Sequence, residues 1–265
     1  MGLTIWQVDA FTDRPLAGNP AAVCVLPAPR EDAWLQAVAS EMNLSETAFL
    51  VRRPDGDLDL RWLTPTVEVD LCGHATLASA HVLWEEGLLA RDATARFHTR
   101  SGLLTAARAG DLIELDFPVK AREPLEDPPD LSAALGAEVL ELQRNRFDYL
   151  ARLESEAAVR QLAPDLSALK RLPVRGIIVT SQAAAGAPYD FVSRFFGPGA
   201  GVDEDPVTGS AHCFLAPYWA ARLGREELTG YQASARGGTV RVRLAGDRVK
   251  LGGQAVTVMK GELLV

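Results

Sequence analysis

Apolar and polar residues alternate in short stretches of this 265-residue chain, which is the pattern of half-buried strands. The alternation is clearest from 57 to 62, where Leu and Trp alternate with Asp and Arg. One face of that strand therefore contacts a core and the other faces water. Short apolar runs at 3–8 and 176–180 predict further strands.

Two helical segments differ from the rest, because small or apolar residues surround them on almost every side. They cover 73–86 and 210–223. A helix that is apolar all round is buried all round, so these segments predict two cores, each wrapped around one helix. Three other segments, 30–42, 131–142 and 154–162, also predict helices.

The two halves of the chain resemble each other at an offset of 136 residues. Gly73 precedes one buried helix and Gly209 the other, and the turn sequence Ala-Gly-Asp at 109–111 recurs at 245–247. Single matches of this kind arise by chance in an alanine-rich chain, which is the alternative explanation. The ordered set of matches predicts two copies of one structural unit.

A segment rich in proline and acids, 119–130, predicts the linker between the two copies. We therefore expect an N-terminal half at 1–118 and a C-terminal half at 119–265. The last strand, near 258–265, either stays with the second half or returns to the first.

Composition and charge limit the classes of function that are expected for this chain. The net charge is −8 and no block is rich in Lys or Arg, so nucleic acid is not an expected partner. The three cysteines form no CxxC pair, which favours a reducing compartment. No apolar run approaches the roughly 20 residues that span a bilayer, and the N-terminus lacks a basic signal-peptide region. We expect a cytoplasmic protein without membrane contact.

The segment from 203 to 212 is the most specific candidate for a functional site. Three acids, the last of them Asp205, stand shortly before Gly209 and Ser210, which open the second buried helix. Free backbone N–H groups and the positive end of the helix dipole favour anion binding there. The alternative is ordinary capping, because Asp and Ser are common N-cap residues.

The equivalent place in the first half carries His74, directly after Gly73. A helix N-terminus is expected to lower the pKa of a histidine and to favour a neutral ring. The alternative is that His74 only caps or packs. If the two helix N-termini face each other across a domain cleft, they make a site for a small carboxylate-bearing substrate.

Glu46 stands where an apolar strand begins. A carboxylate at an apolar edge can have its pKa raised by desolvation, and such a group can take up a proton and return it. The alternatives are a solvated acid or an arginine partner. The four histidines show no HExxH spacing, and no glycine-rich segment matches a nucleotide-binding fingerprint. Neither a metal nor an organic cofactor is expected.

Together these segments resemble the phenazine-biosynthesis (PhzF-like) isomerase family over nearly the whole chain. The segments that carry the resemblance are Gly18-Asn19-Pro20, Ser45-Glu46-Thr47-Ala48-Phe49, Cys72-Gly73-His74-Ala75-Thr76, Arg194-Phe195-Phe196 and the stretch from Asp203 to His212. The resemblance implies an α+β, diaminopimelate-epimerase-like fold. In that fold, two pseudo-symmetric domains each curl a mostly antiparallel, barrel-like sheet around a central helix, with the active site between them. It also implies a homodimer.

The resemblance also implies residue roles. Glu46 matches the acid–base residue that removes a proton from one carbon and delivers it to another, and in the phenazine enzyme this isomerises a dihydro-hydroxyanthranilate. His74 and Asp205 are the other candidate catalytic residues. The candidate substrate-binding residues are Asn19, Gly73, Gly209 and Ser210. The implied function is a cofactor-independent isomerase acting on a small carboxylate-bearing substrate in a biosynthetic process.

Two other functions stay open. Related amino-acid epimerases use a cysteine before each helix, and here Cys72 has Thr208 as its partner at the 136-residue offset. Two-thiol racemisation is therefore disfavoured. An epimerase or racemase of a small amino or hydroxy acid could still use either Cys72 alone or Glu46. Cys72 is a candidate because a helix N-terminus can lower the pKa of a thiol. The other alternative is a non-catalytic scaffold that binds a ligand or a partner.

Overall fold

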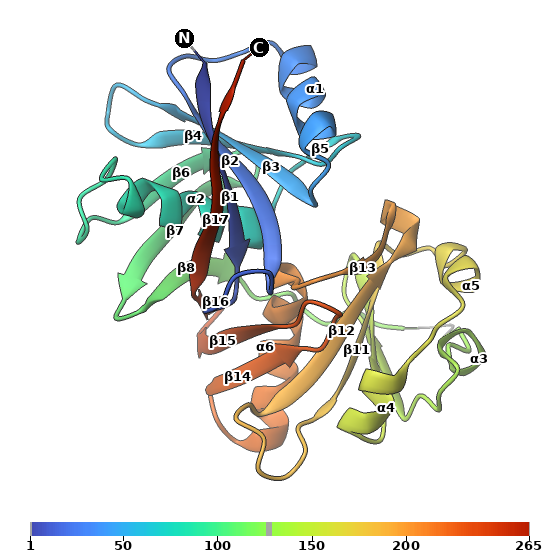
Figure 1. The fold of residues 1–265 in the computed structure, drawn as a ribbon. Coiled ribbons are helices and arrows are strands. Elements are labelled where there is room, and N and C mark those ends of the chain that lie inside the picture. Colours follow the sequence, from blue (N-terminus) through green and yellow to red (C-terminus); the bar gives the residue numbers. More distant parts are fainter. Residues whose placement is uncertain (1, 126–128, 265) are drawn as a thin grey trace. The chain divides into compact units, whose positions relative to one another are not determined.

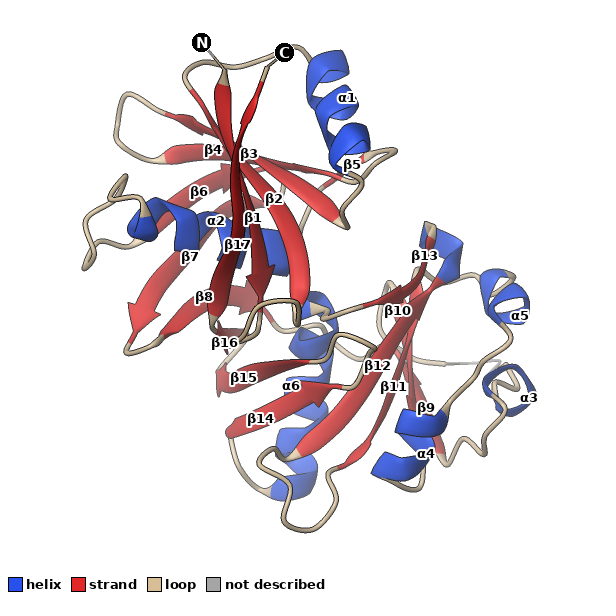
Figure 2. Cartoon of the chain, in the orientation of Figure 1, coloured by secondary structure: helices blue, strands red, loops and turns tan. Residues whose placement is uncertain are grey.

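The computed structural model describes residues 2–125 and 129–264 and divides the chain into two units (Figure 1). Unit 1 comprises Met1–Phe117 and Lys250–Val265, and unit 2 comprises Pro118–Val249. Each unit combines a curled, mostly antiparallel sheet with one long central helix (Figure 2). The predicted α+β fold of two similar halves is confirmed. The chain re-enters unit 1 at Lys250, before the strand that was expected near 258.

Unit 1 is built around β1, which pairs antiparallel with β2 and with β17. β2 runs parallel to β3, and antiparallel pairs join β3 to β4, β6 to β7 and β7 to β8. The strands of this unit are β1 (Leu3–Ala10), β2 (Asn19–Leu26), β3 (Glu46–Arg52), β4 (Leu58–Leu63), β5 (Glu68–Val69), β6 (Ala95–Thr99), β7 (Gly102–Ala109), β8 (Leu112–Pro118, which ends one residue into unit 2) and β17 (Ala255–Leu263). Its helices are α1 (Asp32–Met42) and α2 (Gly73–Glu85).

In unit 2, β10 runs parallel to β11, while β11 with β12 and β14 with β15 are antiparallel pairs. The strands are β9 (Glu141–Arg144), β10 (Asp148–Arg152), β11 (Gly176–Gln182), β12 (Phe191–Gly197), β13 (Val202–Asp205), β14 (Glu227–Gln232) and β15 (Gly238–Ala245), and β16 (Arg248–Gly253) leads back into unit 1. The helices are α3 (Ser132–Leu135), α4 (Glu156–Gln161), α5 (Leu166–Lys170), the 3-10 turn η1 (Pro198–Ala200) and α6 (Gly209–Leu223).

The two buried helices lie where their composition predicts. α2 packs against β1, β2 and β3, and α6 packs against β14 and β15. Nearly all of α2 is buried, because its small residues allow strands to approach closely on every side. The repeat is also visible in the strands, since β7 and β15 begin and end 136 residues apart. The predicted duplication is therefore present in the fold.

The turn before β2 depends on a glycine. Gly18 has φ +64°, and a Cβ atom there would lie 2.2 Å from the carbonyl oxygen of Ala10. Only glycine fits this left-handed, crowded position. Buried Asp9 holds the same turn by accepting a hydrogen bond from the backbone N–H of Leu16 at 2.7 Å. The turn fixes the direction in which Asn19 enters β2.

One predicted helix is wrong. The segment 131–142 forms only the short α3, because Gly136 adopts a left-handed conformation with φ +67° and ends the helix. β9 begins five residues later, at Glu141. Of the predicted linker 119–130, residues 126–128 lie outside the described part of the chain. Among the described residues, no helix has both the length and the apolar character to cross a membrane.

Candidate active site

The starts of two parallel strands and one helix gather four of the predicted positions in unit 1. Asn19 is the first residue of β2 and Glu46 the first of β3, and the parallel pairing of Ala21 with Glu46 brings these strand starts together. Gly73 opens α2, with His74 next to it. The strand pairing and the helix start thus bring together side chains from distant parts of the sequence.

His74 is the centre of this cluster. Its Nδ1 lies 3.1 Å from Asn19 Nδ2, and its Nε2 lies 3.1 Å from Glu46 Oε2. The Sγ atom of Cys72 lies 3.5 Å from Nδ1. The contact with Glu46 has the length of an ion pair, but its angle does not make a hydrogen bond, so Oε2 is buried without a hydrogen-bond partner among the described residues. A carboxylate oxygen thus lies beside a ring nitrogen with its hydrogen-bonding capacity unused.

The pKa of His74 is raised well above its usual value. Burial is the largest single influence and lowers that pKa, but the interactions of the ring with the side chains of Cys72 and then Glu46 together outweigh burial. The expected lowering by the helix N-terminus is therefore wrong. Asn19 can serve either ring state, since its amide offers a donor or, when turned, an acceptor.

Cys72 is the N-cap residue of α2, and its side chain makes no capping hydrogen bond. Burial, and next the negative charge of Glu46, raise the pKa of its thiol to about 11. The pKa lowering that a helix N-terminus could cause is thus reversed here. At neutral pH Cys72 is a thiol, which is a poor base and a poor nucleophile.

In unit 2, Asp205 belongs to a second cluster, at the start of α6. Its Oδ2 accepts a hydrogen bond from the hydroxyl of Thr208 at 2.5 Å. The fully buried Gln232 donates to the Asp205 backbone oxygen at 2.6 Å and accepts from the Thr208 backbone N–H at 2.8 Å. Sequence reasoning missed Gln232, which fixes the segment before Gly209.

Neither Asp205 nor Ser210 is the N-cap of α6. The N-cap is Thr208, and its side chain accepts no backbone N–H. The simple capping explanation for this segment is therefore wrong. His212, also in the predicted motif, is buried, and its Nδ1–H donates to the Thr208 carbonyl at 2.9 Å. Burial lowers its pKa to about 4, so the ring is neutral at pH 7.

Ser210 belongs to a polar relay that the local sequence does not reveal. Buried Asp148 binds Arg175 through two hydrogen bonds of 2.8 and 2.6 Å. Arg175 Nη2 in turn donates to Ser210 Oγ at 3.0 Å. The parallel register of β10 and β11 pairs Asp148 with Gly176, which places the neighbouring Arg175 within reach. Only a correct prediction of that pairing could have found the relay.

Two groups among the described residues have side chains of the kind that ligate metals, with ligand atoms within 4.8 Å of one another. They are Glu46 with Cys72 and His74, and Asp55 with Asp57 and His98. In the first group both ring nitrogens of His74 already face protein atoms. In the second, Asp57 is bound by His98 and by Arg96, whose cation opposes a metal ion. The first group is better suited to holding and moving a proton.

A partly buried carboxylate lies beside a buried imidazole at a helix N-terminus, in a fold of two similar curled halves, and this arrangement is suited to acid–base chemistry. A family profile described as phenazine biosynthesis-like protein matches residues 8–261. The chain belongs to this phenazine biosynthesis-like family.

Similar proteins agree with this assignment. The chain is 54% identical over 268 residues to an uncharacterized isomerase of Halalkalibacterium halodurans, covering 100% of both chains. It is 53% identical to an uncharacterized isomerase of Pseudomonas aeruginosa, covering 99% of each. A crystal structure of a PhzF-family protein from Enterococcus faecalis superposes with a TM-score of 0.93 at 42% identity, covering 100% of both. The predicted family and enzyme class, an isomerase, are confirmed.

A more distant structure shares the fold alone. A hydroxyproline epimerase from Agrobacterium vitis has a TM-score of 0.63 at 13% identity, covering 98% of this chain and 92% of that one. The likeness supports the predicted epimerase-like architecture and carries nothing about the substrate.

Proposed function

We propose that this isomerase moves a proton between two carbon atoms of a small carboxylate-bearing substrate, without a cofactor, and that Glu46 carries the proton. The observation behind the proposal is the buried Oε2 of Glu46, which lies 3.1 Å from His74 and makes no hydrogen bond among the described residues. A general base needs a lone pair free for the substrate.

In the proposed reaction, the Glu46 carboxylate removes a proton from carbon and returns it to a second carbon of the same molecule. The proton is conserved, so no oxidant or reductant is needed. When Glu46 takes up the proton, its charge disappears and the cation on His74 loses its partner. That cation then stabilises the negative charge that has moved onto the substrate. His74 thus acts electrostatically in both halves of the reaction.

The proposal assigns substrate binding in unit 2 to Gly209 and Ser210. The backbone N–H groups at the start of α6 are suitable donors for a carboxylate. Because Arg175 donates to Ser210 Oγ, the Ser210 hydroxyl keeps its own hydrogen for the substrate. Asp205 takes part through Thr208, whose hydroxyl it accepts.

The wider setting is also part of the proposal. We propose a homodimer, as the family resemblance implies, and a cytoplasmic protein, as the cysteine pattern favours. Analytical ultracentrifugation of the purified chain tests the dimer, and a single species of about twice 28.5 kDa is expected.

The test is turnover of dihydro-hydroxyanthranilate in deuterated water, followed by NMR. We expect the wild type to isomerise the substrate with deuterium incorporation, and Glu46→Gln to lose the reaction. Glu41→Gln, an exposed change in α1, is the matched control and keeps full activity. An active Glu46→Gln variant would remove Glu46 from the proposal. If the wild type is inactive, the same exchange assay on small amino and hydroxy acids decides whether the proton chemistry survives with another substrate.

A further inference from the structure

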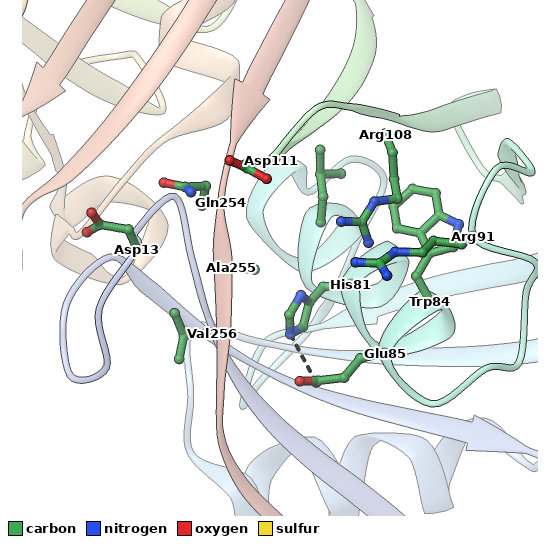
Figure 3. A pocket seen from close by; sticks show the side chains of 11 residues that line it. Asp13, His81, Trp84, Glu85, Arg91, Arg108, Asp111, Gln254, Ala255 and Val256 are labelled. Carbon is green, nitrogen blue, oxygen red and sulfur yellow. Dashed lines mark ion pairs between the residues drawn. The ribbon is translucent and has the colours of Figure 1, made fainter.

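A cavity lies within unit 1, at the opposite end of α2 from His74. Its volume is about 470 Å³, within the range of small-molecule sites. The C-terminal turns of α2, the turn between β7 and β8 and the start of β17 line it (Figure 3). None of the residues proposed above for proton transfer belongs to this lining.

One wall of the cavity is apolar. The buried indole of Trp84 is held by a hydrogen bond from its Nε1 to the Ala93 carbonyl at 3.2 Å. Ile113 and Val256 add aliphatic surface. The guanidinium of Arg108 lies 5.9 Å from the centre of the Trp84 ring. Because the indole is fixed and 7% exposed, it contributes a small, preformed part of this apolar wall.

Two cations lie on one side of the cavity. Figure 3 shows the guanidinium groups of Arg91 and Arg108 directed to the same side, near His81. Neither forms an ion pair within the described part of the chain. His81 brings no further charge at neutral pH, because burial lowers its pKa. A carboxylate placed there would meet two bidentate donors.

Acids and an amide lie on the other side. Asp13, Asp111 and Gln254 line this part of the cavity, away from the two guanidinium groups (Figure 3). Asp13 and Asp111 make no ion pair with a described residue. The third acid of the lining, Glu85, is occupied, since it contacts His81 at 3.1 Å and accepts from Thr257. The cavity therefore holds uncompensated charges of both signs, on different sides.

We propose that this cavity binds a free α-amino acid with an apolar or aromatic side chain. The carboxylate would pair with Arg91 and Arg108, the ammonium group with Asp111, and the side chain would pack against Ile113, Val256 and the exposed part of Trp84. A ligand that lacks one of the two charges forgoes the ion pairs on that side of the cavity, so both charges are needed for full affinity. The proposal is independent of the proposed proton transfer at Glu46.

Isothermal titration calorimetry of the whole protein with three matched compounds tests this inference. L-Phenylalanine carries both charges, 3-phenylpropionate lacks the ammonium group, and 2-phenylethylamine lacks the carboxylate. We expect saturable binding of L-phenylalanine, weakened about tenfold or more for each analogue. No saturable binding of L-phenylalanine, or equal binding of either analogue, overturns the proposal.

Variants locate the binding. The double variant Arg91→Ala/Arg108→Ala should weaken L-phenylalanine binding about tenfold or more, and it removes only exposed side chains. Arg241→Ala, which removes an exposed arginine of unit 2, is the control and should leave binding unchanged. In ¹⁵N NMR, the indole N–H resonance assigned with Trp84→Phe should shift on titration. Binding that is unaffected by the double variant contradicts the proposed site.

Discussion

The ion pair of Asp148 and Arg175 allows a test of two things, its contribution to the stability of the protein and the proposed role of Ser210. Asp148→Asn keeps the shape of the side chain but removes the charge that accepts two hydrogen bonds from Arg175. Breaking a fully buried pair costs about 3–5 kcal/mol. The side chain of Arg175 is 37% exposed and can regain water, so we expect the free energy of unfolding to fall by about 2–3 kcal/mol.

The assay is urea denaturation of the full chain, with KM and kcat measured on the same preparations. Because Arg175 then loses its anchor and no longer orients Ser210, KM should rise more than kcat falls. Asp247→Asn, an exposed change in the turn before β16, is the control and should cost less than about 0.5 kcal/mol. Equal stability of Asp148→Asn and wild type would refute the energetic reasoning. Lost stability with unchanged KM would refute the positioning role.

Three other outcomes follow from the site and the turn that precedes it. Gly18→Ala should lower the free energy of unfolding by more than about 2 kcal/mol in urea denaturation, because its Cβ would meet a backbone oxygen. The control is Gly56→Ala, which is also at positive φ but in open space and should cost about 1 kcal/mol. Equal costs for the two variants would contradict the argument. Since the pKa of Cys72 is about 11, Cys72→Ala should retain turnover within about threefold. Ellman's reagent should label the native thiol slowly at pH 8. Rapid labelling would show that the sulfur is exposed or ionised. The raised pKa of His74 means that its stabilising contribution is complete below the unfolded pKa near 6.5 and is lost as pH rises through the folded pKa. His74→Gln should remove that alkaline decline, measured by urea denaturation at several pH values, and an unchanged pH profile would contradict the assignment.

Hydrophobic pattern and composition predicted the fold well where a segment's environment is the same on all sides. The segment that became α2 is small or apolar all round, and it is buried all round. Local pattern failed at 131–142, where the helical spacing continues past Gly136 but the backbone there turns left-handed. Such an ending depends on one φ angle, which spacing does not encode.

The residues of the candidate site were predicted from the sequence, but the protonation state of His74 was not. Its members were found as separate segments, yet the predicted direction of the His74 pKa was wrong, because the helix dipole was considered and the contacts of the ring with Cys72 and Glu46 were not. Glu46 comes near His74 only through the parallel register of β2 and β3. The relay from Asp148 to Ser210 depends on a strand pairing in the same way. Contacts of this kind are long-range facts that a linear pattern cannot supply.

The last strand has a consequence for how the chain is made. β17 pairs with β1 along the whole of that strand, from Leu3 with Leu263 to Ala10 with Ala255. Unit 1 therefore combines strands that are synthesised before unit 2 with a strand that is synthesised after it. Unit 2 lies between them and can fold while synthesis continues. Until β17 has been synthesised, one edge of β1 stays open, and a chain that stops before Ala255 would keep an exposed strand edge prone to aggregation.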